Sequence, residues 1–181
     1  LKNYTSIISN NKHYLTNDSF GLPAYIYMII FNRLDIFKEI IPEIEEYVDY
    51  RKLLKLSIIL KRFNFVKFIL DKGIHVDCLL SNEYPIHLSI KHTSIDIFKL
   101  LINKGGNIYA QDNNKLSSIR LTIKMLNKNN DQQLLKILDM LLEDIDIKND
   151  FFVEELLSCT DTKLIDHIIP RYQDIISYKY N

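Results

Sequence analysis

The chain has 181 residues, enough for one domain or one array of repeats with a substantial hydrophobic core. Hydrophobic residues make up 47% and charged residues 25%, a globular composition that excludes general disorder. Lys plus Arg and Asp plus Glu both number 23, so the overall charge favours neither nucleic acid nor an anionic membrane. Any partner must therefore be recognised by a local surface.

Cysteines and apolar runs set further bounds. Cys78 and Cys159 are too few and too isolated for the disulfide framework of a secreted domain. The longest uncharged apolar run, 20–32, contains Pro23 and is too short to span a bilayer. No signal peptide is recognisable, although the chain begins at Leu1 without a Met, which suggests trimming. We expect an intracellular, cytoplasmic protein without membrane association.

Pairs of short apolar segments recur along the chain. The sequence LDIFK at 34–38 is nearly repeated as FNFVK at 63–67 and IDIFK at 95–99, at separations of 29 and 32 residues. A matched segment precedes the last two, LSI at 56–58 and at 88–90. A period of about this length is typical of stacked supersecondary units.

Two weaker copies follow. Segment 117–123 lies 33 residues after 84–90, and its second apolar segment is 137–142. The extra spacing fits an insertion in the Asn-rich stretch 124–131, which we expect to be a loop. A fifth, faint copy is expected within 148–181.

The positions of proline and glycine in each copy predict a helical hairpin. The apolar segments are too short to be stable as isolated helices, so they must pack on one another. Pro85 fits the first turn of a helix, where its missing N–H is not needed. Gly73 and Gly105 follow the second segments, where a left-handed residue ends a helix. Each copy should read helix, tight turn, helix, Gly, then an extended connection of about ten residues.

The segment YPIHL at 84–88 resembles the TPLHLA signature of ankyrin repeats, and 82–114 aligns with the ankyrin pattern without a gap. LLSNEYPIH at 79–87 also looks like the divergent ankyrin proteins of poxviruses. The resemblance implies an all-α ankyrin-repeat solenoid of about four to five repeats with short hairpin fingers. The expected units are 1–20 (partial), 21–50, 51–81, 82–114 (best preserved), 115–147 (with the insertion) and 148–181 (C-terminal cap).

Candidate catalytic groups are sparse. The ankyrin resemblance implies a structural role for His87, hydrogen bonding the loop to the adjacent repeat. Cys78 lies near His75 and Asp77, but this extended segment has no orienting partner and no second cysteine pair, so a nucleophile or a metal site is a weak hypothesis. Cys159, with Asp166 and His167, is expected to be a partly buried thiol. We therefore expect no enzyme, no cofactor and no metal.

The resemblance also implies a concave partner-binding surface made of fingers and exposed positions of the first helices. Large apolar residues at such positions are typical of protein interfaces. Shifted helix boundaries would turn several of them inward, and that alternative stays open. The expected contact residues are Phe20, Leu22, Phe31, Arg51, Leu60, Leu80, Ser81, Glu83, Lys91, His92, Asn113, Asn114, Leu116, Lys124 and Met125; neighbouring positions Ser19, Ile30, Asp49 and Ile59 were reached by the same alignment.

The functional expectation is a non-catalytic protein–protein interaction module, monomeric by itself, that binds another protein and no nucleic acid. If the source is a virus or a host-associated bacterium, the partner is expected to be a host protein in the host cytoplasm. A toxin-neutralising immunity protein is an alternative. A small cysteine hydrolase is the alternative from another class.

Overall fold

The computed structural model describes residues 17, 19, 21–128, 131–144, 162 and 165–170, and all statements below concern these residues. The regular elements among them are helical, which confirms the expected all-α class for this part of the chain, and a single isolated bridge joins Asn17 to Pro23. The elements are α2 (Ala24–Ile30), α3 (Leu34–Ile44), the 3-10 helix η2 (Glu45–Tyr47), α4 (Tyr50–Ile59), α5 (Phe63–Asp71), α6 (Pro85–Lys91), α7 (Ile95–Asn103), α8 (Ser118–Leu126) and α9 (Gln132–Asp144).

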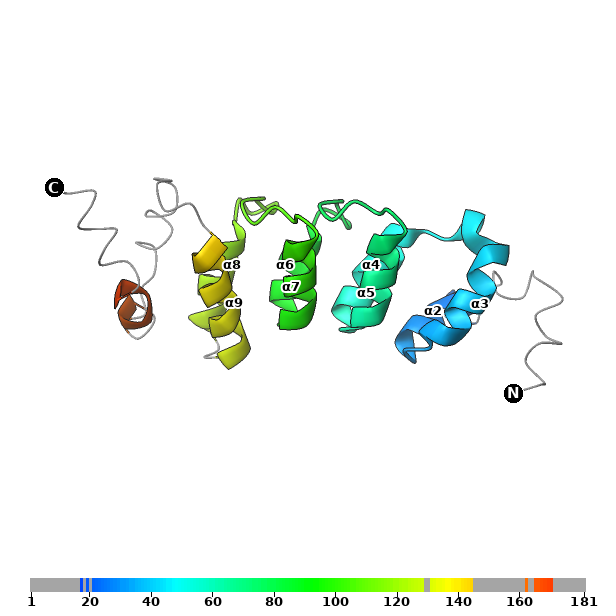
Figure 1. Cartoon of the computed structure of the whole chain (residues 1–181), viewed down its shortest axis with the longest axis horizontal. Helices are drawn as coiled ribbons and strands as arrows, with labels where there is room; N and C mark the ends of the chain where they lie inside the picture. The colour runs from blue at the N-terminus through cyan, green and yellow to red at the C-terminus, as the bar shows by residue number, and fades with distance from the viewer. Residues whose placement is uncertain are drawn as a thin grey trace.

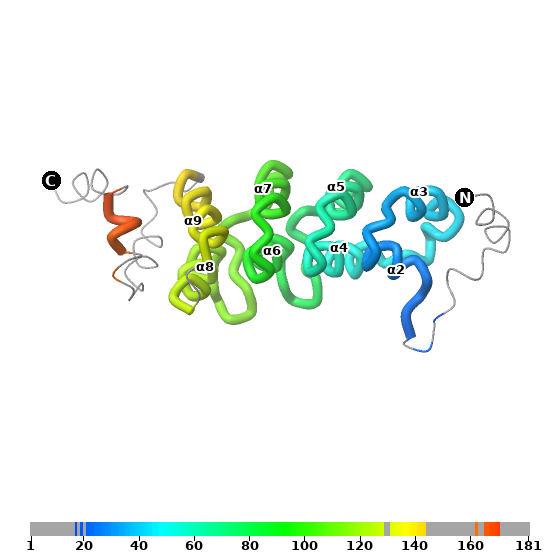
Figure 2. The backbone as a smooth tube through the Cα atoms, turned by 90° about the horizontal axis from the view of Figure 1, so that it is seen from below, coloured from blue at the N-terminus to red at the C-terminus, as the bar shows by residue number. Residues whose placement is uncertain are grey.

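Consecutive helices pair into antiparallel hairpins that stand side by side in a row (Figure 1). The pairs are α2 with α3, α4 with α5, α6 with α7, and α8 with α9. Along the row, α2, α4, α6 and α8 contact one another in order, and α5, α7 and α9 do the same. We call α2, α4, α6 and α8 the inner row, and α3, α5, α7 and α9 the outer row; Figure 2 shows the two rows as separate layers.

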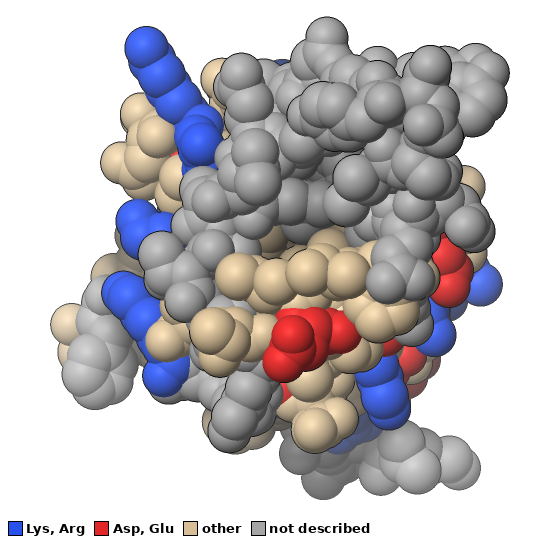
Figure 3. All heavy atoms as spheres, turned by 90° about the vertical axis from the view of Figure 1, so that its left-hand side faces the viewer, with Lys and Arg blue, Asp and Glu red and all other residues tan. Residues whose placement is uncertain are grey.

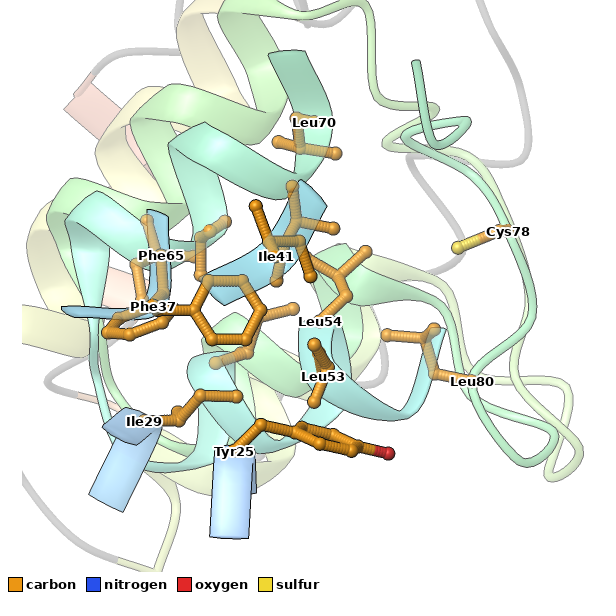
Figure 4. Packing of buried hydrophobic residues seen from close by; sticks show 14 of the residues in the cluster. Tyr25, Ile29, Phe37, Ile41, Leu53, Leu54, Phe65, Leu70, Cys78 and Leu80 are labelled. Atoms are coloured by element: carbon orange, nitrogen blue, oxygen red, sulfur yellow. The ribbon is translucent and has the colours of Figure 1, made fainter. Parts of the chain in front are cut away.

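The core lies between the rows, in two clusters that meet at α6 and α7. In the first cluster Phe37 and Phe65, on α3 and α5, meet edge to face with 5.4 Å between ring centroids (Figure 4). Aromatic pairs prefer this geometry because the positive ring edge meets the negative ring face. The helices are thus held by their neighbours, as expected for segments this short.

The turns inside the first three hairpins repeat the same backbone geometry. Asn32, Lys61 and Thr93 all take left-handed conformations, with φ of 56°, 55° and 50°. In each case the next residue donates its N–H back across the turn, Arg33 to Met28 O, Arg62 to Ser57 O and Ser94 to Ser89 O. These bonds satisfy carbonyl groups at the end of the inner helix. The repeat seen in the sequence is therefore also a repeat of turn geometry.

The helix ends predicted from Gly and Pro are confirmed. Gly73 and Gly105 follow α5 and α7 with φ of 90° and 83°, and Pro85 is the first residue of α6. After each glycine an extended loop crosses to the next inner helix: the first finger, 74–84, and the second finger, 106–117. In Figure 2 both fingers project from the side of the inner row.

The connection between α3 and α4 differs from the prediction. Instead of an extended segment of about ten residues, η2 follows α3 directly and Asp49 is the N-cap of α4. No glycine stands after α3 to allow a left-handed end, and the Asp49 carboxylate accepts hydrogen bonds from the N–H groups of Arg51 and Lys52. The expected finger is therefore wrong for this hairpin, and Asp49 is a capping residue.

The predicted insertion loop at 124–131 is partly helical, since α8 continues through Leu126. Ser117 starts this helix by accepting a hydrogen bond at its Oγ from the N–H of Arg120. In the described part of the chain, no helix has the length and apolar character needed to cross a bilayer.

Candidate functional site

The inner row presents an equivalent residue at or near the C-terminal end of each inner helix. Phe31, Leu60 and His92 are the C-caps of α2, α4 and α6. Met125 is the matching position of α8, where it lies inside the longer helix. We call these four residues the cap row. All four were predicted as contact residues, and the structure gives them a common place in successive hairpins.

Side-chain contacts join the turns of the first three hairpins. The side chain of Arg62 donates from Nε to the carbonyl of Ile29 at 3.1 Å and from Nη2 to that of Ile30, so it caps the preceding inner helix α2. Lys61 Nζ donates to the carbonyl of Thr93 at 3.4 Å in the next hairpin. Neither Lys61 nor Arg62 was predicted for the site. Their position directly after Leu60 in the sequence is the signal that could have indicated them.

The α2 end of the face is apolar. Phe31 is 70% exposed, and its ring stacks on Tyr27 with 6.3 Å between centroids and 20° between planes. Leu22 is also exposed, whereas Leu60 is half-buried against the first cluster. An aromatic side chain this exposed is unusual on a solvated helix end and is typical of an interface anchor.

The middle of the face is polar. Glu83, from the first finger, forms an ion pair with Lys91 at the end of α6, and both are half-buried. Burial lowers the pKa of His92, the neighbouring Lys61 and Lys91 lower it further, and Glu83 opposes them. The lowered pKa of His92 is therefore mainly an effect of burial.

One predicted anchor is wrong. Leu80 is only 2% exposed and lies in the first cluster, where Figure 4 shows it pointing towards Leu53. The finger turns at Ser81 and Asn82, which both have positive φ, as in a type I′ hairpin. Because this tight turn folds the preceding segment of the finger onto the helices, Leu80 faces inward and Ser81 is exposed at the tip.

The other predicted residues are spread along the row. Asn113 and Asn114 are exposed at the tip of the second finger, while Leu116 is half-buried against the second cluster. Arg51 is exposed in the first turn of α4, and on α8 Lys124 is exposed and Met125 half-buried. Phe20 lies outside the described residues.

The candidate nucleophile is a buried thiol. Cys78 is free and buried, and burial raises the pKa of its thiol, although Arg51 opposes this. His75 Nδ1 accepts a hydrogen bond from the N–H of Asp77, and Asp77 Oδ1 accepts one from the N–H of Asn107 in the second finger at 2.9 Å. These groups link the two fingers to each other. No group of three potential metal ligands occurs among the residues described.

The residues flagged near the C-terminus are only partly described. Cys159 lies outside the described residues. His167 Nε2 lies 2.8 Å from Asp139 Oδ1, so this histidine contacts α9.

His87 is fully buried beneath the second finger. Its ring meets Tyr84 edge to face at 5.8 Å. Burial lowers the pKa of His87, while the Asp112 carboxylate and the Ala110 backbone on the finger side oppose this. Neither ring nitrogen reaches full hydrogen-bonding geometry with a described residue. The position supports a role in packing between helix and finger.

No protein-family model matches the chain, and no curated protein matches it either. Function must therefore be argued from the face formed by the inner row and the fingers.

Proposed function

We propose that this chain is an ankyrin-repeat protein that binds a partner protein through the inner row and the fingers, without catalysis of its own. The resemblance at 82–114 supports the family, together with Pro85 at the start of α6, His87 buried under the next finger and left-handed Gly73 and Gly105. Ankyrin arrays are solenoids in which each unit contacts its neighbours and the small rotation per repeat creates a concave surface.

The exposed aromatic pair carries the proposal. Phe31 and Tyr27 stack on each other at the head of the cap row, where three successive hairpins present equivalent residues. A large aromatic side chain with two torsions loses little entropy on binding and buries much apolar area. The buried thiol of Cys78 supports a binding role over hydrolysis, because a desolvated thiol is a poor nucleophile.

The mechanism would be steric. A preformed face occludes or recruits a partner in the cytoplasm, in the host cytoplasm if the source is a virus or a bacterial effector, and the backbone changes little on binding. The partner-contacting set is the predicted one without Leu80, which belongs to the core.

The test compares two exposed aromatic residues. In pull-downs from candidate host lysate, Phe31→Glu should lose the partners that the wild type retains, since truncating a hot spot costs about 2 kcal/mol or more. Tyr47→Glu is the matched control, because Tyr47 is 60% exposed on η2 and is not among the predicted contact residues. Circular dichroism verifies that both variants fold. If Phe31→Glu keeps every partner, the proposed face is wrong.

A further inference from the structure

Charge is divided between the two rows of helices. The inner helices with their turns, 24–33, 50–62, 84–94 and 117–128, contain ten Lys and Arg and no Asp or Glu. The outer segments, 34–47, 63–72, 95–104 and 132–144, contain ten Asp and Glu and six Lys. Figure 3, seen along the row, shows Lys and Arg along the left edge, which is the inner-row side, and Asp and Glu together with further Lys or Arg towards the centre and right. A chain with no net charge thus has one cationic face.

Several of these cations are not neutralised within the described part of the chain. Among the inner-row cations, Arg33, Lys52 and Lys91 form ion pairs with Asp35, Asp49 and Glu83. Arg51, Lys61 and Lys124, from α4, its turn and α8, are exposed and make no ion pair with a described residue. Lys61 contacts only an uncharged carbonyl, so its charge remains available to a partner.

The two ends of the face differ in chemistry. Helix α2 contains no charged residue and ends at the stacked Tyr27 and Phe31. The cations without an ion pair to a described residue, Arg51, Lys61 and Lys124, lie on α4, its turn and α8, on either side of the Glu83–Lys91 pair. The face is therefore apolar at one end and carries unpaired positive charge further along, a pattern that a partner must match to avoid leaving charges unpaired.

We propose that this face binds an acidic polypeptide segment, with an apolar side chain of that segment against Phe31 and Tyr27 and its carboxylates at the unpaired cations of α4, its turn and α8. This inference rests on the proposed function and specifies its partner. The apolar pair Phe31 and Tyr27 at one end of the face favours a polypeptide, which offers apolar side chains beside its carboxylates, over nucleic acid, whose backbone carries a charge at every phosphate.

The test uses short random peptides displayed on phage and selected on the whole chain. Arg51→Glu plus Lys124→Glu reverses two exposed charges of the inner row. Lys67→Glu plus Lys99→Glu, on α5 and α7, makes the same change in net charge at exposed outer positions. Selected peptides should be rich in Asp and Glu, and the inner-row variant should bind them about tenfold or more weakly, while the outer-row control keeps its affinity. The affinity should also fall with added salt.

The outcomes separate this inference from the proposed function. Peptides without acidic bias that are lost on Phe31→Glu would leave the binding face in place and overturn the acidic partner. Peptides insensitive to Phe31→Glu and to both charge reversals would overturn both proposals. A single-stranded oligonucleotide that binds the wild type more tightly than the acidic peptides, and is lost in the inner-row variant, would also overturn the assignment to polypeptide.

Discussion

The two fingers make similar turns that are stabilised by different side chains. Each finger begins after a glycine in the left-handed conformation, Gly73 or Gly105, and reverses direction above the inner row. In the first finger Leu80 and Glu83 exchange backbone hydrogen bonds, with Leu80 N–H donating to Glu83 O at 2.8 Å. In the second, Asp112 N–H donates to Leu116 O at 2.9 Å. Leu80 and Asp112 are equivalent positions, 32 residues apart, as the glycines are.

These equivalent residues stabilise their fingers differently. Leu80 is buried in the first cluster. Asp112 is also buried, but its Oδ1 accepts hydrogen bonds from the N–H groups of Asn114 and Leu116, at 2.8 and 3.0 Å. A backbone conformation can thus be held either by apolar burial from below or by side-chain hydrogen bonds from within. Protonation of Asp112 should then weaken the second finger, whereas the equivalent position of the first finger has no carboxylate to protonate.

The largest effect is expected from Leu80→Ala. Removing a buried leucine side chain leaves a cavity, so the free energy of unfolding should fall by about 2–5 kcal/mol. Leu79→Ala is the matched control, because its side chain is 50% exposed, and it should change stability by less than about 0.5 kcal/mol. Urea denaturation measures both. Equal losses in the two variants would contradict the inward orientation of Leu80.

Asp112→Ala should have the next largest effect. It leaves two finger N–H groups without their acceptor, so stability should fall by about 1–3 kcal/mol. Asp112→Asn keeps an acceptor at Oδ1 and should lose less. Asn113→Ala, at an exposed tip position, is the control. A finger held mainly by packing would instead tolerate Asp112→Ala as well as it tolerates the control.

The pH dependence of stability should come partly from His87 beneath the second finger. Burial lowers the pKa of His87 below its ordinary 6.5, so the unfolded chain takes up this proton first as the pH falls. Stability should therefore rise with pH through this range, with a slope from this residue of at most about 1.4 kcal/mol per pH unit. His87→Gln should flatten the slope in urea titrations, whereas Leu80→Ala should keep it. An unchanged slope in His87→Gln would show that other groups are responsible.

A second pH effect belongs to Asp112 itself. Burial raises the pKa of Asp112, but the hydrogen bonds from the N–H groups of Leu116 and Asn114 lower it more. The pKa of Asp112 is therefore below its ordinary value of 3.8. The stabilisation it provides is present above that pH and is lost as the pH falls through the lowered value. Asp112→Asn should remove this acid-side loss, which the same titrations measure at lower pH.

The smallest change in stability is expected from replacing a left-handed residue in each finger by glycine. Lys115 in the second finger and Asn82 in the first have φ of 56° and 69°. Lys115→Gly should raise stability by about 0.5 kcal/mol, because the relief of left-handed strain exceeds the added chain entropy. Asn82→Gly should gain less, since asparagine tolerates this conformation. Thermal unfolding compares the two, and a larger gain for Asn82→Gly would contradict the assignment of strain.

Much of the local structure could be predicted from the chain alone. The period of the apolar segments placed the paired helices, and Gly73, Gly105 and Pro85 marked their ends, because glycine and proline act through their own backbone restrictions. The connection between α3 and α4 escaped prediction, because the Asp49 cap and η2 replace a glycine signal. The helical start of 124–131 escaped too, because Ser117 and the apolar face of α8 extend the helix through Leu126.

The candidate site divides in the same way. Counting along the repeat could place the four residues of the cap row, Phe31, Leu60, His92 and Met125. The absence of acidic residues from the inner segments can also be read from the sequence. The inward turn of Leu80, the Glu83–Lys91 pair and the capping of α2 by Arg62 needed the tertiary structure. Helix ends and turns depend on neighbours a few residues away, whereas the direction of a finger side chain depends on the hairpin beneath it. Sequence therefore determined the units, and packing between units decided which residues face a partner.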